Sequence, residues 1–246
     1  LYYNSREWWF FRNNDNFMAS TIEFISSEED YGVIPEPYPA RKLIPDWYKK
    51  LDNKLHNGFE SSTIKRCPPF LDVMQTGWII PLAADVYFKV NEDCSGIDYE
   101  WKFYKEMIGQ HSVEQLSKTV KHPSHPTPPL KFLNYWQIKV KKGWSVYFVP
   151  PFNRVDKRFE CISGLVDCDK YNEYINFPFI WKQPNFDGIL EAGTPLVQVI
   201  PVPRKVLHKD FKCRSQTKKE VEELHMTRRK RASHESLYRD KLWVRK

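Results

Sequence analysis

Short apolar runs that end at Pro or Gly recur along this chain, and they predict β-strands. Ile22 and Phe24 alternate with polar residues, as expected for a strand with one buried face. Later runs are rich in β-branched and aromatic residues, which favour strands. These runs cover residues 78–82, 85–90, 99–104, 132–140, 144–149, 159–166, 174–181 and 196–202. Their spacing of roughly 10–15 residues is typical of a β-sandwich, a jelly roll or a small barrel.

Helical patterns are fewer and shorter. A Pro favours the first turn of a helix, so residues 45–51 are predicted to form a short one. A second brief helix is expected within residues 110–120. Near the C-terminus, Thr217 and Glu220 have the spacing of a capping box, which predicts a helix from about residue 218 to 230.

The 246 residues divide into three parts. Residues 1–17 are interpreted as an N-terminal extension, because Met18 begins a segment that resembles a natural start. Residues 18–204 are predicted to be one β-rich body, and the hydrophobic share of 41% is enough for a packed core. Residues 205–246 are predicted to be a basic helical tail.

The excess positive charge is confined to this tail. From residue 204 to the end, 15 Lys and Arg stand against 6 Asp and Glu, whereas the rest of the chain is slightly acidic. The strongest basic run is Arg228, Arg229, Lys230 and Arg231, and it is a candidate for contacts to nucleic-acid phosphates. Two other interpretations stay open: a solvated helix end, or a tail that docks on an acidic neighbouring subunit.

Cysteine usage and hydropathy favour a cytoplasmic protein. The five Cys are odd in number and none has Cys-x-x-Cys spacing, so we expect reduced thiols and neither a disulfide framework nor a zinc knuckle. No run approaches the roughly 20 apolar residues needed to cross a bilayer, and no membrane partner is expected. His122 and His125 have metal-like spacing, but a Pro-rich loop explains them equally well, and no metal or other cofactor is expected.

One stretch resembles a known family. It runs from Gly164-Leu165-Val166-Asp167-Cys168-Asp169-Lys170-Tyr171 to Gly193-Thr194-Pro195-Leu196-Val197-Gln198. Its order and spacing resemble the hairpin and last strand of trimeric dUTPases and dCTP deaminases. The resemblance implies a mainly β, jelly-roll or β-clip fold and a homo-oligomer, with a trimer as its form.

The same resemblance implies roles for particular residues. Asp167 would be the catalytic base that orients the attacking water, and Tyr171 would pack against the sugar. Asp169, Arg154 and Gln198 would contribute to ligand binding, and Mg²⁺ would be the cofactor of such an enzyme. From the residues themselves, Asp167 and Asp169 would face one side if they lay on a strand, with residues 174–181 returning as a second arm. The alternative is that both carboxylates order a tight turn.

Other parts of the enzyme pattern are missing. Lys170 is an extra residue before Tyr171, no Ser-Gly follows Arg154, and the chain beyond Arg204 contains no glycine to close over a triphosphate. The leading hypothesis is therefore a non-enzymatic binding or assembly protein on a dUTPase-like scaffold. The alternatives are a divergent nucleotide hydrolase or deaminase that uses Asp167, and a nucleic-acid-binding protein that uses the tail.

The body also resembles an uncharacterised family of marine tailed phages and bacteria. The resemblance lies in Glu36-Pro37-Tyr38-Pro39-Ala40, Ile44-Pro45-Asp46-Trp47-Tyr48-Lys49, Lys65-Arg66-Cys67-Pro68-Pro69-Phe70, Gly143-Trp144-Ser145 and Asn176-Phe177-Pro178-Phe179. It covers residues 30–204 and implies phage or bacterial origin. For a phage-encoded protein, the location would be the host cytoplasm or the virion. No known activity comes with this resemblance.

Overall fold

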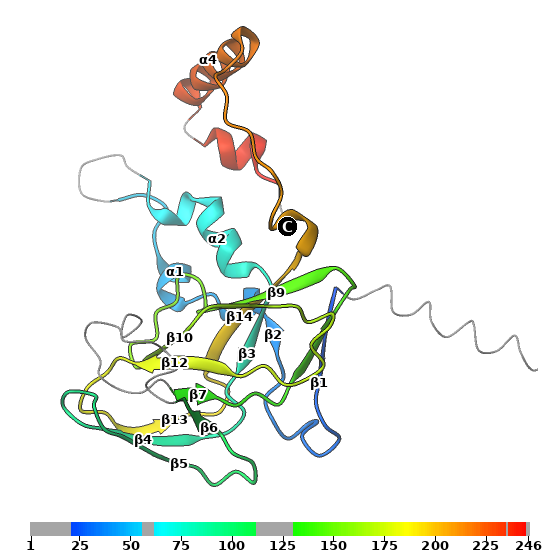
Figure 1. Ribbon diagram of the computed structural model, residues 1–246. Helices are drawn as coiled ribbons and strands as arrows, with labels where there is room; N and C mark the ends of the chain where they lie inside the picture. The colour runs from blue at the N-terminus through cyan, green and yellow to red at the C-terminus, as the bar shows by residue number, and fades with distance from the viewer. Residues whose placement is uncertain (1–20, 56–61, 112–129, 235, 245–246) are drawn as a thin grey trace, which may run out of the picture.

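The computed structural model describes residues 21–55, 62–111, 130–234 and 236–244. These residues form a mainly β body with short helices, and a C-terminal helix that stands away from it (Figure 1). The predicted fold class, mainly β with a basic C-terminal helix, is confirmed. Residues 1–17 and the segment of His122 and His125 lie outside the described residues, and so does most of the helix expected within 110–120.

A five-stranded antiparallel sheet holds the segments that matter most for function. Its order is β11-β9-β14-β3-β2, so the longest strand, β14, lies at its centre. The bounds are β2 Tyr38–Pro39, β3 Trp78–Pro81, β9 Trp144–Val149, β11 Gly164–Val166 and β14 Pro195–Pro203.

Three smaller antiparallel sheets complete the body. A four-stranded sheet has the order β10-β12-β7-β6, a three-stranded sheet has the order β13-β4-β5, and β1 pairs with β8. The bounds are β1 Ile22–Ile25, β4 Val86–Val90, β5 Ile97–Glu100, β6 Ile108–Gln110, β7 Leu130–Phe132, β8 Gln137–Val140, β10 Phe159–Cys161, β12 Phe177–Trp181 and β13 Asp187–Leu190.

Aromatic side chains from separate sheets build one core. Strand β12 buries Phe177, Phe179 and Trp181, which alternate along it as the period of a strand requires. Phe179 stacks on Phe132 of β7 with ring centroids 3.9 Å apart, and Trp181 lies 4.6 Å from Phe88 of β4. The core therefore joins the four-stranded and three-stranded sheets, and its large rings supply much of the buried apolar area.

Short helices lie between the strands. Helix α1, Asp46–Lys50, confirms the helix predicted at 45–51. Helix α2, Pro68–Gln75, was not expected from the sequence, although two Pro at its first positions suit a helix start. Among the described residues, 3₁₀ turns cover Ala40–Leu43 (η2), Ile64–Arg66 (η3) and Arg204–Val206 (η5).

Some predicted strands are shorter than expected or divided. Residues 132–140 split into β7 and β8, because the buried Asn134 side chain donates to the Trp136 carbonyl and accepts from its N–H. These local bonds replace the ladder bonds of a continuous strand. The run 99–104 is strand only to Glu100, where β5 ends.

The predicted strand 159–166 also divides, and this changes the hairpin. Its first half is β10, which pairs with β12, whereas its second half is β11, which pairs with β9 in another sheet. The run 174–181 becomes β12, which starts at Phe177. The prediction that β12 returns as the second arm of β11 is therefore wrong, because the two strands belong to different sheets.

The tail has the predicted helix. Helix α4, Lys218–Ser233, begins at Thr217, whose hydroxyl accepts from the Glu220 N–H while the Glu220 carboxylate accepts from the Thr217 N–H. The predicted capping box is confirmed. A π-helical turn, η6 (Tyr238–Leu242), follows, and the Trp243 Nε1 donates to Asp72 Oδ2 of α2 at 2.9 Å. The chain thus leaves the body after β14 and returns to it at α2.

Candidate functional site

The segment singled out by the sequence is a tight turn at the end of β11. The Asp167 carbonyl accepts from the N–H groups of Lys170 and Tyr171, at 2.8 and 2.9 Å. Asp167 and Asp169 therefore lie in a turn and do not share the face of a strand, which corrects their predicted placement. The extra Lys170 fits this geometry because it supplies one of the two N–H donors that close the turn.

Both carboxylates nevertheless meet at one cation, Arg204. Asp167 Oδ1 accepts from Arg204 Nε at 2.9 Å and from the Ser145 hydroxyl at 2.6 Å. Asp169 is nearly buried; it accepts from Arg204 Nη2, and its Oδ2 accepts from the Gly143 N–H at 2.7 Å. The result is a hydrogen-bonded ion-pair network of two carboxylates, one guanidinium and the start of β9.

Sheet order explains why these residues meet. Strand β9 lies between β11 and β14, and it is antiparallel to both. Asp167 continues β11 toward Ser145, while Arg204 follows β14 and its N–H donates to the Gly143 carbonyl at 2.8 Å. The three segments therefore end at the same edge of the sheet. Neither Arg204 nor Ser145 was predicted from the sequence to be a site residue.

Charge pairing sets the titration of this network. The hydrogen bond from Ser145, with that from Arg204, lowers the pKa of Asp167, and the bond from Arg204 lowers the pKa of Asp169. Asp169 in turn raises the pKa of Arg204. Both carboxylates are therefore ionised at neutral pH and share one cation, which is an arrangement suited to holding a turn.

The other two residues assigned by resemblance also bond within the body. Arg154 Nη2 donates to the carbonyls of Ala40 and Met74 at 3.1 and 2.9 Å, and burial lowers the pKa of Arg154. The Gln198 side chain is fully buried; its Oε1 accepts from the Phe152 N–H at 2.9 Å, and its Nε2 donates to the Val73 carbonyl at 3.0 Å. Both side chains join the loop after β9 to the segment around α2.

Tyr171 stands apart from this network. Its side chain is 48% exposed, and no side-chain hydrogen bond of Tyr171 is found among the described residues. The structure thus brings Asp167 and Asp169 together and places Arg154 and Gln198 together elsewhere, while Tyr171 joins neither pair.

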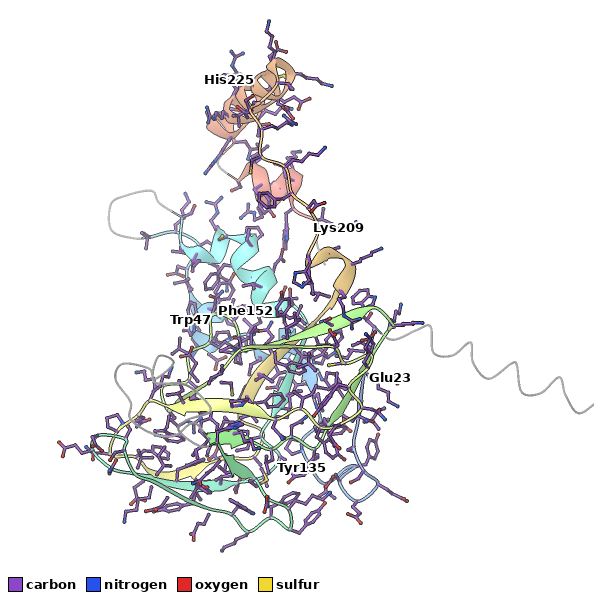
Figure 2. All side chains as sticks on the ribbon, in the orientation of Figure 1. Glu23, Trp47, Tyr135, Phe152, Lys209 and His225 are labelled. Atoms are coloured by element: carbon purple, nitrogen blue, oxygen red, sulfur yellow. The ribbon has the colours of Figure 1, made fainter. Side chains whose placement is uncertain are left out.

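A cleft of about 880 Å³ opens beside Arg154. Its walls include Trp47 of α1 and Phe152 of the loop after β9, which Figure 2 labels on the same side of the body. The turn residues Asp167, Asp169 and Tyr171 do not line it. Within one chain, the cleft and the candidate catalytic carboxylate are therefore separate.

The charges around this cleft largely cancel. Lys49 pairs with Asp46 at 3.0 Å, and Lys182 pairs with Glu160 at 3.0 Å. Among the described residues, three buried side-chain atoms lack a hydrogen-bond partner, and one of them, Nη1 of Arg154, belongs to a residue that lines this cleft. The cleft therefore has no strong net charge, and one buried, unpaired donor lies in a residue of its wall.

The tail carries its cations differently. No residue of α4 is buried, and the side chains of Arg228, Arg229, Lys230 and Arg231 are exposed. Four consecutive residues point in four directions around a helix, so this end of α4 is positive on every side. The helix projects above the body, with His225 labelled on it in Figure 2.

A second pocket, of about 650 Å³, lies where the tail returns to the body. Its walls come from the η3 and α2 segment, from the face of α4 that carries Thr227 and Arg231, and from η6. Its lining residues are Ser62, Thr63, Arg66, Cys67, Pro68, Pro69, Thr227, Arg231, Ser236, Leu237, Tyr238, Arg239 and Leu242. No sequence pattern indicates this pocket, because its walls are far apart along the chain.

The described residues contain no group of three or more His, Cys, Asp or Glu placed to hold a metal ion. The network at Arg204 does not suit Mg²⁺, because a guanidinium already occupies the position between the two carboxylates. All five cysteines are present as free thiols. Across the described ranges, no helix has both the length and the apolar character to cross a membrane.

Comparisons with known proteins give distant matches to solved structures. No family model matches the chain, and no match was found among curated proteins. The chain is similar to the dUTPase of Staphylococcus bacteriophage 80alpha, at 8% identity over 81% of this chain and 90% of that one, with a TM-score of 0.36. It is also similar to a dUTPase from phage phi11 of S. aureus, at 9% identity over 81% of this chain and 99% of that one, with a TM-score of 0.35.

These comparisons do not extend to the family of marine tailed phages and bacteria, whose resemblance stays a prediction from the sequence. At such identity and TM-score, the likeness to dUTPases assigns no activity to this chain. The site is therefore judged by its own geometry.

Proposed function

We propose that this chain is a non-enzymatic binding protein, in which the β body is a scaffold and the basic tail contacts the partner. The observation that carries the proposal is the Arg204 network, because its guanidinium bonds to both carboxylates that an enzyme would need. A general base must reach a proton on its substrate. Asp167 instead accepts from Ser145 and Arg204 within its own chain.

Nucleotide turnover tests this proposal directly. We expect no release of phosphate, pyrophosphate or ammonia from dUTP or dCTP by the purified protein, with or without Mg²⁺. Turnover that is lost in Asp167→Asn and kept in Asp98→Asn would overturn the proposal. Asp98 is an exposed carboxylate on β5, so it controls for the loss of one negative charge.

A second candidate function is nucleic-acid binding through α4, and the exposed cations around its end favour it. Each phosphate contact to a single strand adds about 0.7 to the slope of log affinity against log salt. Replacing Arg228 and Arg229 by Gln should therefore lower that slope by about 1.4. The matched control is Lys218→Gln with Lys219→Gln, which removes the same charge from the other end of α4. An equal decrease of the slope in the two variants would mean a general electrostatic attraction to the helix, and it would contradict this candidate.

A divergent nucleotide hydrolase or deaminase stays the third candidate. The Nη1 of Arg154 favours it, because this buried donor has no hydrogen-bond partner among the described residues and Arg154 lines the cleft. A thermal-shift screen with deoxynucleotides would detect a ligand even without turnover, because binding to the folded state raises the melting temperature. A rise with dUTP that disappears in Arg154→Met would support it, whereas a flat response would remove it.

Self-association is part of the leading proposal. It rests on the resemblance of residues 164–202 to trimeric dUTPases and dCTP deaminases. We propose a homo-oligomer, with a trimer as the form suggested by the resemblance. Light scattering on the eluting protein measures its mass against the 29.5 kDa of one chain. A single-chain mass at micromolar concentration would contradict this part of the proposal.

A further inference from the structure

The outer face of the three-stranded sheet β13-β4-β5 is acidic. Residues 85–102 and 185–192 contain this sheet and its adjoining loops, and they carry seven Asp and Glu against two Lys. All seven acidic residues are exposed: Asp85, Glu92, Asp93, Asp98, Glu100, Asp187 and Glu191. Like charges on one surface repel one another, so this face favours a cationic partner.

The negative charge is concentrated at one end of this face. Lys89 on β4 lies opposite an acidic residue on each neighbouring strand, which compensates part of that row. At the other end, Asp85 precedes β4, Glu100 ends β5 and Glu191 follows β13. Among the described residues, none of these three forms an ion pair. We call these three residues the acidic sheet end.

An apolar side chain lies beside the acidic sheet end. Phe88 of β4 is fully buried, so its neighbour Tyr87 points to the outer face. The register places Tyr87 between Ile189 of β13 and Glu100 of β5, and Ile189 is 54% exposed. Protein interfaces combine an apolar centre with a polar rim. This surface therefore suits a partner that brings cations and an apolar group together.

The C-terminal half of α4 has the complementary pattern. Residues 225–233 contain four Lys and Arg and no Asp or Glu. Met226 is 53% exposed, and it shares a helix face with Arg229 and Lys230, which follow it by three and four residues. None of these three side chains lines the pocket where the tail returns to the body. This helix face thus offers an apolar side chain next to two cations.

The two surfaces lie at opposite ends of one chain. Helix α4 projects at one end of the molecule, and the sheet β13-β4-β5 lies at the other end (Figure 1). The helix face of Met226 therefore does not reach the acidic sheet end of its own chain.

We propose that the C-terminal half of α4 docks on the acidic sheet end of a second copy of the chain. The inference rests on the proposed binding function of the tail, and it names the partner. Residues 225–233 span about 14 Å of helix, at about 1.5 Å per residue. Three strands about 4.8 Å apart give a sheet of similar width. The helix and the sheet therefore match in size as well as in charge.

Such a contact joins two different surfaces, so each copy gives one tail and receives another. A closed ring uses every tail, whereas an open row of copies leaves one tail unused. One helix on three short strands buries less area than the about 1,200–2,000 Å² of a standard interface. A single contact should therefore be weak and sensitive to salt, and ring closure should strengthen it.

Charge reversal on either side tests the contact. Glu100→Lys with Glu191→Lys reverses the acidic sheet end, and Arg229→Glu with Lys230→Glu reverses the helix face. Light scattering over a concentration series of the full chain measures the dissociation constant of self-association. We expect each reversed variant to raise this constant by at least about tenfold, because close charge pairs across an interface become repulsive. Far-ultraviolet circular dichroism checks that α4 stays helical.

Two control variants carry the same change of charge at other places. Glu28→Lys with Glu36→Lys reverses two exposed residues of the body outside this sheet. Lys218→Glu with Lys219→Glu reverses the other end of α4. Each should raise the dissociation constant by less than about twofold, since exposed charges away from the contact are screened. Equal effects in controls and reversed variants would overturn the proposal.

A chain that carries all four contact substitutions distinguishes docking from damage. In this chain the helix face is acidic and the sheet end is basic, so opposite charges meet again. We expect it to recover the oligomeric mass that each reversed variant loses. Loss without recovery would overturn the proposal.

The remaining outcomes separate this inference from the proposed function. Reversed variants that keep the oligomeric mass would overturn the inference and leave self-association in place. An unaltered chain of single-chain mass that binds single-stranded DNA through Arg229 and Lys230 would assign these cations to nucleic acid, and it would overturn the inference too. Failure of the non-enzymatic proposal is measured separately, by nucleotide turnover.

Discussion

The body and the tail use arginine in opposite ways. In the body, Arg204 is bound to Asp167 and Asp169, and Arg154 donates to main-chain carbonyls. In the tail, Arg228 and Arg229 are exposed, and no ion pair involves them within the part of the chain that the structure describes. Cations in the body therefore stabilise loops, whereas cations on α4 remain available to an external anion.

The two regions also differ in what holds them together. The body buries large aromatic rings from several sheets in one cluster, whereas α4 buries none of its residues. Burial of apolar area is the main source of folding free energy. The tail helix instead depends on its capping box and on the Arg214–Glu220 ion pair, which lowers the pKa of Glu220 to about 2. Changes in the body should thus alter global stability, and changes in the tail should act locally.

The largest expected effect is on the free energy of unfolding, when a Phe→Ala substitution in the body is compared with one in the tail. Phe179→Ala removes a fully buried ring that stacks on Phe132, and it should lower the free energy of unfolding by about 3–5 kcal/mol. Phe211→Ala, in the tail at 86% exposure, should change it by less than about 0.5 kcal/mol. Urea unfolding followed by tryptophan fluorescence measures both. Similar losses in the two variants would show that the tail shares the core of the body.

A smaller effect on stability is expected when Arg204, the cation of the Asp167 and Asp169 network, is replaced. Arg204→Gln leaves Asp167 and Asp169 without their cation, and it should lower the melting temperature of the whole body. Arg214→Gln breaks an ion pair of the tail, and it should leave that temperature unchanged. Thermal unfolding monitored by near-ultraviolet circular dichroism compares them. An unchanged melting temperature in Arg204→Gln would mean that the turn does not need this cation to be stable.

Acid should remove the difference in the free energy of unfolding between the unaltered protein and Arg204→Gln. The folded pKa values of Asp167 and Asp169 lie below the ordinary value of 3.8, so the pair stabilises the fold above that pH. This stability is lost as the pH falls through the lower, folded pKa values. Urea unfolding at pH 7, 5, 4 and 3 measures this difference. It should be constant down to pH 5 and become smaller below pH 4. A difference that persists at pH 3 would assign the effect of Arg204 to packing.

The smallest effect is expected at the start of α4. Thr217→Ala removes the hydroxyl that accepts from Glu220 N–H, and it should cost the helix about 1 kcal/mol. Because α4 buries no residue, its amide exchange should quicken while that of the body stays the same. Thr227→Ala, inside the same helix, should not quicken it, since Ala favours helix interiors. Faster exchange in β14 of the Thr217 variant would show that the tail and the body unfold together.

Local signals predicted the elements that local interactions define. Strand β9 matches the predicted 144–149, because Gly143 and Pro150 punctuate its ends. Helix α4 begins where the capping box indicates. Long-range pairing was not predictable: the run 159–166 is continuous in sequence, but its halves join different sheets.

The site shows the same division. The spacing of Asp167 and Asp169 pointed to a shared task, and the turn alternative matches where they lie. Their partner Arg204 is 35 residues further along the chain than Asp169, and only the order of the strands brings it near. The register of β9 against β14 is set by the packing of whole sheets, which no local motif reports.

The return of the chain from η6 to α2 has a thermodynamic consequence (Figure 1). The bond between Trp243 and Asp72 makes the segment after β14 a closed loop rather than a free end. The entropy cost of closing a flexible loop grows only with the logarithm of its length, so doubling the length adds about 0.6 kcal/mol. Insertions in the exposed segment 209–216 should therefore be inexpensive. The distance that α4 reaches can change between related proteins while the sheets beneath it stay the same.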